Sequence, residues 1–140
     1  MPDARQQRPV PQLQLRLAAD SEAVGTVRAC VSEFVHRHGL IDAEEIVLAA
    51  CQMSANAVLH AFHGAGAGGE TEFEVSADFD GGYLRLEVTE DDAEGPAAPE
   101  LGLGLRLVER VADDVRVSTP ACGGTRVRAR FTRAPPGLAT

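Results

Sequence analysis

Two runs of alternating apolar and polar residues, 71–79 and 83–89, constrain the fold of this chain most. In each run every second residue is apolar, which places one set of side chains on a single face of an extended strand: Phe73, Val75, Ala77 and Phe79, then Leu84, Leu86 and Val88. The Asp-Gly-Gly sequence between the runs is a turn signal, so together they predict a β-hairpin. A hairpin with one apolar face needs a covering layer to bury that face.

The rest of the chain supplies that layer and extends the sheet. Alternation and helical spacing of apolar residues predict strands at 13–17, 115–119 and 125–131 and helices at 20–38, 42–61 and 102–115. Asp20 or Ser21 is expected to cap the first helix, and Gly39 to end it. Strands and helices do not alternate as in a doubly wound fold. We therefore expect an α/β two-layer sandwich, with a mixed, mostly antiparallel sheet covered on one face by three helices.

Length and composition predict one domain at residues 12–132, with a flexible arm at 1–11 and a flexible tail at 133–140. The net charge of -8 argues against nucleic acid as a direct partner, because phosphate binding needs a basic surface. The sequence shows no signal-peptide pattern, and no apolar run approaches the ~20 residues that span a bilayer. We therefore expect a cytoplasmic protein without a membrane partner.

Competing chemical patterns are weaker. The histidines of the HRH sequence at 36–38 diverge on the predicted helix, and the acidic loop at 90–94 resembles a calcium site in composition only. The three cysteines lack zinc spacing and are expected to be free thiols: Cys30, Cys51 and Cys122.

The predicted helix at 42–61 carries polar residues on an otherwise apolar sequence. Gln52, Asn56 and His60 are each four residues apart, so they lie on one helix face about a turn apart. A polar stripe on a core helix must be satisfied by water, backbone, a metal or a ligand. The stripe is therefore a candidate functional site.

Three local motifs, in this order, resemble the Bergerat-fold ATPases (gyrase, heat-shock chaperones, histidine kinases and mismatch-repair ATPases). They are ANAVLHAF at 55–62, ELGLGLRLVERVADDV at 100–115 and GGTRVRARF at 123–131. Within that superfamily the chain is most similar, over about residues 12–132, to the bacterial anti-sigma-factor serine kinases. The resemblance implies a homodimeric regulator that binds ATP and magnesium. It also implies binding of a sigma factor and/or an anti-anti-sigma antagonist near Arg28, with phosphorylation of a serine on the antagonist.

The resemblance also assigns roles to single residues. Asn56 matches the family's magnesium ligand, whose side-chain carbonyl is a suitable hard oxygen donor. Gly102 and Gly104 match a glycine motif at a helix start, where bare N–H groups and the helix dipole face phosphates. Three more residues match positions beside the nucleotide: His60, Leu105 and Thr125. A water-satisfied core asparagine, a structural histidine and an ordinary strand threonine are the alternatives.

Two positions depart from the family pattern. The general-base glutamate is replaced by Gln52, which cannot accept a proton at any useful pH. The aspartate that accepts the adenine amino group is replaced by Glu90, with Asp91 one step on, and the glycines that follow it in the family read Asp92 and Glu94. Two alternatives therefore stay open: a pseudokinase that holds its partner without phosphotransfer, and a nucleotide-free interaction module of the same fold.

Overall fold

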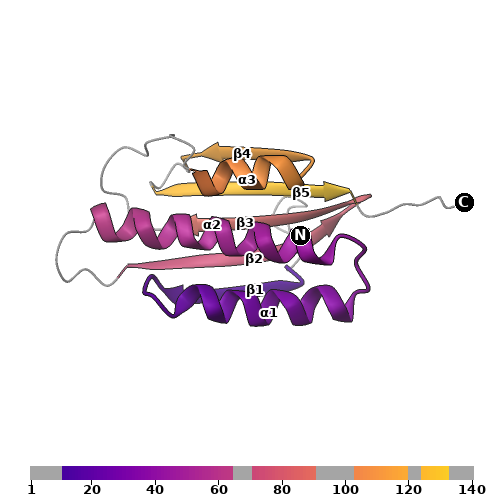
Figure 1. Cartoon of the computed structure of the whole chain (residues 1–140), viewed down its shortest axis with the longest axis horizontal. Coiled ribbons are helices and arrows are strands. Elements are labelled where there is room, and N and C mark those ends of the chain that lie inside the picture. The colour runs from indigo at the N-terminus through magenta and orange to yellow at the C-terminus, as the bar shows by residue number, and fades with distance from the viewer. Residues whose placement is uncertain (1–10, 65–70, 91–102, 120–123, 133–140) are drawn as a thin grey trace, which may run out of the picture.

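The computed structural model describes residues 11–64, 71–90, 103–119 and 124–132 (Figure 1). In chain order these form β1 (Leu13–Ala18), α1 (Ala23–Arg37), α2 (Ala43–Gly64), β2 (Glu72–Asp80), β3 (Tyr83–Glu90), α3 (Leu103–Val111), β4 (Asp114–Ser118) and β5 (Thr125–Thr132). The predicted order of elements is confirmed. The expected arm (except Pro11) and the tail at 133–140 lie outside the described residues. No helix in the described segments is long and apolar enough to cross a membrane.

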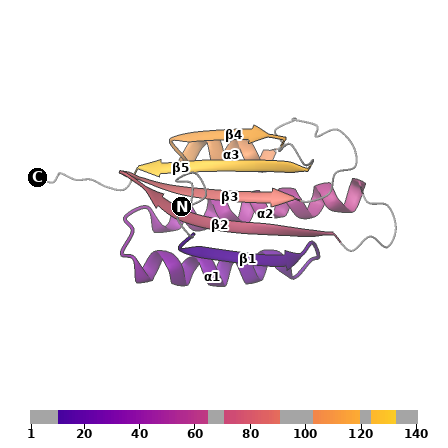
Figure 2. The same ribbon diagram turned by 180° about the vertical axis from the view of Figure 1, so that it is seen from behind.

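The five strands form one sheet in the order β1-β2-β3-β5-β4, and every pairing among them is antiparallel. The hairpin of β2 and β3 turns at Gly81, which has a φ of 62°. All three helices lie on one face of the sheet, and no described helix or strand covers the other face (Figures 1 and 2). The structure thus confirms the expected two-layer sandwich, with its sheet antiparallel throughout.

The core lies between the helices and the covered face of the sheet. Inward residues alternate along β2, β3 and β5, so Val75, Val88 and Val127 sit side by side on one rung and are at most 3% exposed. Helix α2 covers the sheet with four buried residues of small or flexible side chain: Ala49, Ala50, Met53 and Ala57. Small side chains let the helix backbone approach the strands closely, which fixes the position of the polar stripe on the same helix.

Two predicted helix ends were wrong. The helix predicted over 102–115 ends at Val111, because the residues from Asp114 onward pair with β5 as strand β4. The carboxylate of Asp113 accepts a hydrogen bond from the Thr132 hydroxyl at 2.6 Å and helps to hold this turn against the sheet. Helix α2 continues to Gly64, three residues beyond the expected end.

The expected cap of the first helix at Asp20 or Ser21 was wrong, because the N-cap is Glu22, which makes no side-chain capping hydrogen bond. Asp20, two residues before it, accepts a hydrogen bond from the Glu22 backbone N–H at 3.0 Å. At the other end Gly39 adopts a φ of 61°, and its N–H donates to the carbonyl of His36, as expected for a helix that stops at glycine.

The face of the sheet opposite the helices carries paired charges. Arg128 of β5 donates to Glu87 of β3 at 2.7 Å, and Arg85 donates to Asp78 at 3.1 Å. The hydrogen bond to Asp78 raises the pKa of Arg85 above its ordinary value, more than burial lowers it. These two pairs link β5 to β3 and β3 to β2, whereas the buried Nε atom of Arg126 on β5 has no hydrogen-bond partner among the described residues.

Ser54 on α2 is fully buried, and its hydroxyl has no hydrogen-bond partner. An unsatisfied buried polar group costs about 1–3 kcal/mol. We expect Ser54→Ala to raise the free energy of unfolding by ~1 kcal/mol more than Ser32→Ala, measured by urea denaturation. Ser32 lies half-buried on α1 and controls for the higher helix propensity of alanine. A loss of stability in Ser54→Ala would contradict this account.

Candidate functional site

The polar stripe of α2 faces the end of β3 and the start of α3. Gln52 and Asn56 are half-buried, and the His60 side chain is 40% exposed. Helix α2 packs against α1, α3 and β3, so its stripe lies among three other elements. The stripe residues, spaced four apart as predicted from the sequence, therefore face a junction between elements and not only the core.

One end of the stripe is tied to the sheet. The Nδ1 atom of His60 lies 2.8 Å from Oε1 of Glu90, the last residue of β3, whose side chain is only 4% exposed. Thr125, 8% exposed, is the cross-strand neighbour of Glu90 on β5, and Phe73 is its neighbour on β2. The structure therefore brings together three residues predicted at the nucleotide: His60, Glu90 and Thr125.

The other end of the stripe is packed against the first turn of α3. A Cβ atom added at Gly104 would lie 2.5 Å from Oε1 of Gln52, closer than non-bonded atoms approach. Glycine at this position therefore allows the Gln52 amide to lie against the helix start. Leu105, the next residue, is 2% exposed and belongs to the core, where it anchors α3.

Asn56 lies between these two contacts, one helical turn from each of its stripe neighbours. Magnesium takes oxygen ligands and usually needs only one or two from the protein, with phosphates and waters supplying the rest. An asparagine carbonyl on a half-buried helix face fits that donor set. Within the described ranges no group of three or more His, Cys, Asp or Glu side chains is placed to hold a metal by itself.

Several predicted residues cannot be placed. Asp91, Gly102 and Cys122, and the substituted positions Asp92 and Glu94, lie outside the described residues. Their predicted roles therefore stay predictions. The other two cysteines, Cys30 and Cys51, are free thiols, as expected.

A groove of about 360 Å³ runs between α1 and α2, and sequence analysis did not find it. Its walls are largely apolar, and it reaches the stripe at one point; its lining includes Arg28, Val35, Val47, Leu48, Cys51 and Gln52. The signal available in the sequence was the wide apolar arc of both helices, but such an arc is equally typical of helices packed in an ordinary core. Gln52 lines the groove and also lies against Gly104, so the groove and the candidate site share this residue.

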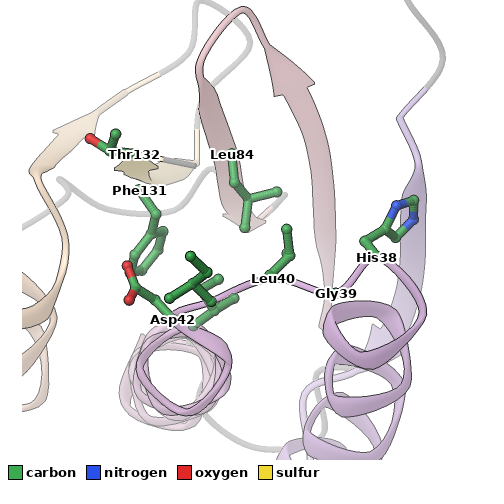
Figure 3. A pocket seen from close by; sticks show the side chains of 9 residues that line it. His38, Gly39, Leu40, Asp42, Leu84, Phe131 and Thr132 are labelled. Atoms are coloured by element: carbon green, nitrogen blue, oxygen red, sulfur yellow. The ribbon is translucent and has the colours of Figure 1, made fainter. Parts of the chain in front are cut away.

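A smaller cavity of about 90 Å³ lies near the first turn of α2 (Figure 3). Leu84 and Phe131 point into it from the sheet, toward the loop that joins α1 and α2, where Leu40 and Asp42 lie. None of the predicted nucleotide residues lines this cavity.

The fold and this junction define a class of protein. Residues 17–131 match the histidine kinase-like ATPase domain, and the chain therefore belongs to that family. The resemblance to Bergerat-fold ATPases inferred from the motifs is thereby confirmed.

One solved structure of low sequence identity has a similar chain course. A chain in the crystal structure of the SiaB–SiaC complex from Pseudomonas aeruginosa is 14% identical, with a TM-score of 0.62 and coverage of 91% of this chain and 92% of that one. The NMR structure of the histidine kinase domain of the E. coli osmosensor EnvZ is 17% identical, with a TM-score of 0.43 and coverage of 93% and 94%. The first of these shows a shared fold. A comparison with curated proteins finds no match.

The contact between Gln52 and Gly104 predicts an energetic coupling. Gly104→Ala should favour helix α3 but displace the Gln52 amide, whereas in a Gln52→Ala background nothing is displaced. We expect the stabilisation by Gly104→Ala to be larger in that background by about 0.5–1 kcal/mol, measured as a double-mutant cycle in urea. Additive effects would show that the Gln52 side chain does not rest on Gly104 in solution.

Proposed function

We propose that this chain is an ATP-binding regulator of the anti-sigma-factor type. The observation that carries the proposal is the polar stripe of α2, which meets Glu90 at one end and Gly104 at the other. These are the positions at which the family resemblance expects the adenine acceptor, the metal ligand and the phosphate-binding helix start. Membership of the histidine kinase-like ATPase family supports nucleotide binding as the chemistry of this junction.

Each part of the nucleotide has a candidate partner in this arrangement. Glu90 would accept a hydrogen bond from the adenine amino group, with Thr125 beside it on the next strand. Asn56 would hold magnesium, which supplies charge neutralisation for the phosphates. The start of α3 at Gly104 would present backbone N–H groups and the positive end of the helix dipole to the phosphate oxygens.

Phosphoryl transfer to a protein serine is the reaction that this site would perform. The serine oxygen would form a bond to the γ-phosphorus while the bond from that phosphorus to the leaving ADP oxygen breaks. The serine proton must also leave, and Gln52 stands where the family places the carboxylate that takes it, so the proton would pass to solvent water. Transfer relies mainly on positioning and electrostatics, so the native chain should be a slow kinase.

A second candidate function, a pseudokinase, is favoured by the same residue. Without a carboxylate at position 52, nucleotide binding could serve only to hold the fold and its partner surface in one state. The two candidates share a binding site and differ in whether phosphate is transferred.

The groove between α1 and α2 is our candidate docking surface for the partner. It shares Gln52 with the stripe, so a serine-bearing segment of an antagonist protein lying in it would come near the phosphate end of the site. A sigma factor is the other expected partner, docking near Arg28 at the same groove. The neighbouring structure from Pseudomonas aeruginosa is a complex of SiaB with SiaC, in keeping with a protein partner here. We also propose a homodimer located in the cytoplasm.

Binding of Mg-ATP is the first test of this function. The native chain should bind Mg-ATP or Mg-ADP with a Kd between about 1 μM and 1 mM in calorimetric titration. Asn56→Ala should weaken binding at least ~10-fold in the presence of magnesium, because a metal ligand is lost. Leu59→Ala, an exposed neighbour on the same helix, serves as the matched control and should bind like the native chain. No heat and no thermal shift at millimolar nucleotide would favour the nucleotide-free interaction module.

The role of Gln52 is tested by restoring the missing base. Gln52→Glu keeps the side-chain length and adds a proton acceptor, so phosphate transfer to the cognate antagonist should be at least ~10-fold faster than in the native chain. Gln52→Met, of similar length but without a proton acceptor, is the control and should gain nothing. If the native chain already matches Gln52→Glu, or if that variant binds ATP without any gain, Gln52 does not limit the chemistry.

A further inference from the structure

The contact between His60 and Glu90 carries a further inference about which base the site accepts. Glu90 is the only buried carboxylate in the described part of the chain, with its side chain 4% exposed, and His60 covers it from α2 at 2.8 Å. An ionised carboxylate can only accept hydrogen bonds, so this contact with a carboxylate at Glu90 requires the tautomer of His60 that carries its hydrogen on Nδ1. In that tautomer the histidine donates to Oε1 of Glu90.

We propose that His60 is a positioning residue that selects a 6-amino purine over a 6-oxo purine by holding Glu90 as a hydrogen-bond acceptor. This inference rests on the proposed function, in which a purine nucleotide binds at this junction. Sequence resemblance placed both residues at the nucleotide separately, and only the structure joins them in one hydrogen bond.

The physical reason is the direction of a buried acceptor. The contact of 2.8 Å between Nδ1 of His60 and Oε1 of Glu90 fixes the direction in which the oxygens of this buried side chain point. Phe73 and Thr125 hold the Glu90 backbone from the strands on either side, so the histidine has only the side chain to orient.

An acceptor held in this way discriminates between bases. Adenine presents an exocyclic amino group, which donates to a carboxylate, whereas inosine presents a 6-oxo group, which is itself an acceptor and would meet the carboxylate unfavourably. Without the Nδ1 donor the oxygens of Glu90 are less firmly directed at the amino group, so loss of the histidine should narrow the preference for ATP over ITP. Asn56 lies one turn from His60 on the same face of α2, so residues of one helix would act at both the base and the metal.

Two amide variants of the same residue test the proposal. In His60→Asn the amide nitrogen can occupy the place of Nδ1, whereas in His60→Gln it reaches the place of Nε2, away from Oε1 of Glu90. We would measure the Kd values of Mg-ATP and Mg-ITP by calorimetry for both, since these nucleotides share their ribose and triphosphate. The ratio of the ITP Kd to the ATP Kd should stay within ~3-fold of the native ratio in His60→Asn. In His60→Gln the ratio should fall at least ~10-fold, because hydrogen bonds to charged groups contribute about 1.5–3 kcal/mol.

Two further variants complete the design. Glu90→Gln replaces the acceptor by an amide that both donates and accepts, so its ratio should approach one. Leu59→Ala, adjacent in sequence but 59% exposed, should keep the native ratio. Thermal melting of each variant confirms that it is folded.

Three outcomes would overturn the proposal. In the first, His60→Gln leaves both Kd values and their ratio as in the native chain. In the second, it weakens the binding of both nucleotides equally, which would indicate a merely structural contact. In the third, the native chain binds ATP and ITP equally well. If the native chain binds neither nucleotide, the proposed function itself fails and this inference falls with it.

Discussion

The packing of α2 against the middle of the sheet is the interaction on which the rest of the structure depends. Ala49, Ala50, Met53 and Ala57 are all at most 1% exposed, and three of the four have only a methyl side chain. A close-packed interior of this kind resists small shifts of the helix along or around its axis. Because the helix is fixed, the polar residues on its adjacent face are fixed as well, which is the requirement for any site built from them.

The site is assembled from contacts between distant parts of the chain. His60 meets Glu90, thirty residues later, and Gln52 meets the first turn of α3 at Gly104. The first contact joins α2 to the central strand and the second joins it to α3, so the two ends of the stripe are anchored independently. A ligand lying along α2 would therefore contact three elements whose relative positions are set by the core.

Buried polar groups mark where this fold departs from a simple apolar core. Within the described residues three polar side chains are buried: Ser54, Glu90 and Thr125. Glu90 and Thr125 are neighbours on adjacent strands at the site, whereas Ser54 lies in the core without a partner. The first two belong to the proposed nucleotide site, and local rules of packing are commonly broken where a protein binds a ligand. Ser54 has no such explanation in the structure.

The sequence by itself determined the order of elements, the β2–β3 hairpin and the helix end at Gly39. These depend on the period of apolar residues and on turn chemistry, both of which are local properties. It also indicated the polar stripe, because four-residue spacing on a helix is a local property too. Tertiary structure decided what the stripe meets. The end of α3 at Val111, the hydrogen bond from His60 to Glu90 and the groove between α1 and α2 all depend on which segments pack together, and no local pattern specifies such pairings. Residues 112–115 continue a helical pattern in sequence, yet hydrogen bonds to β5 outweigh that preference once the strand is present.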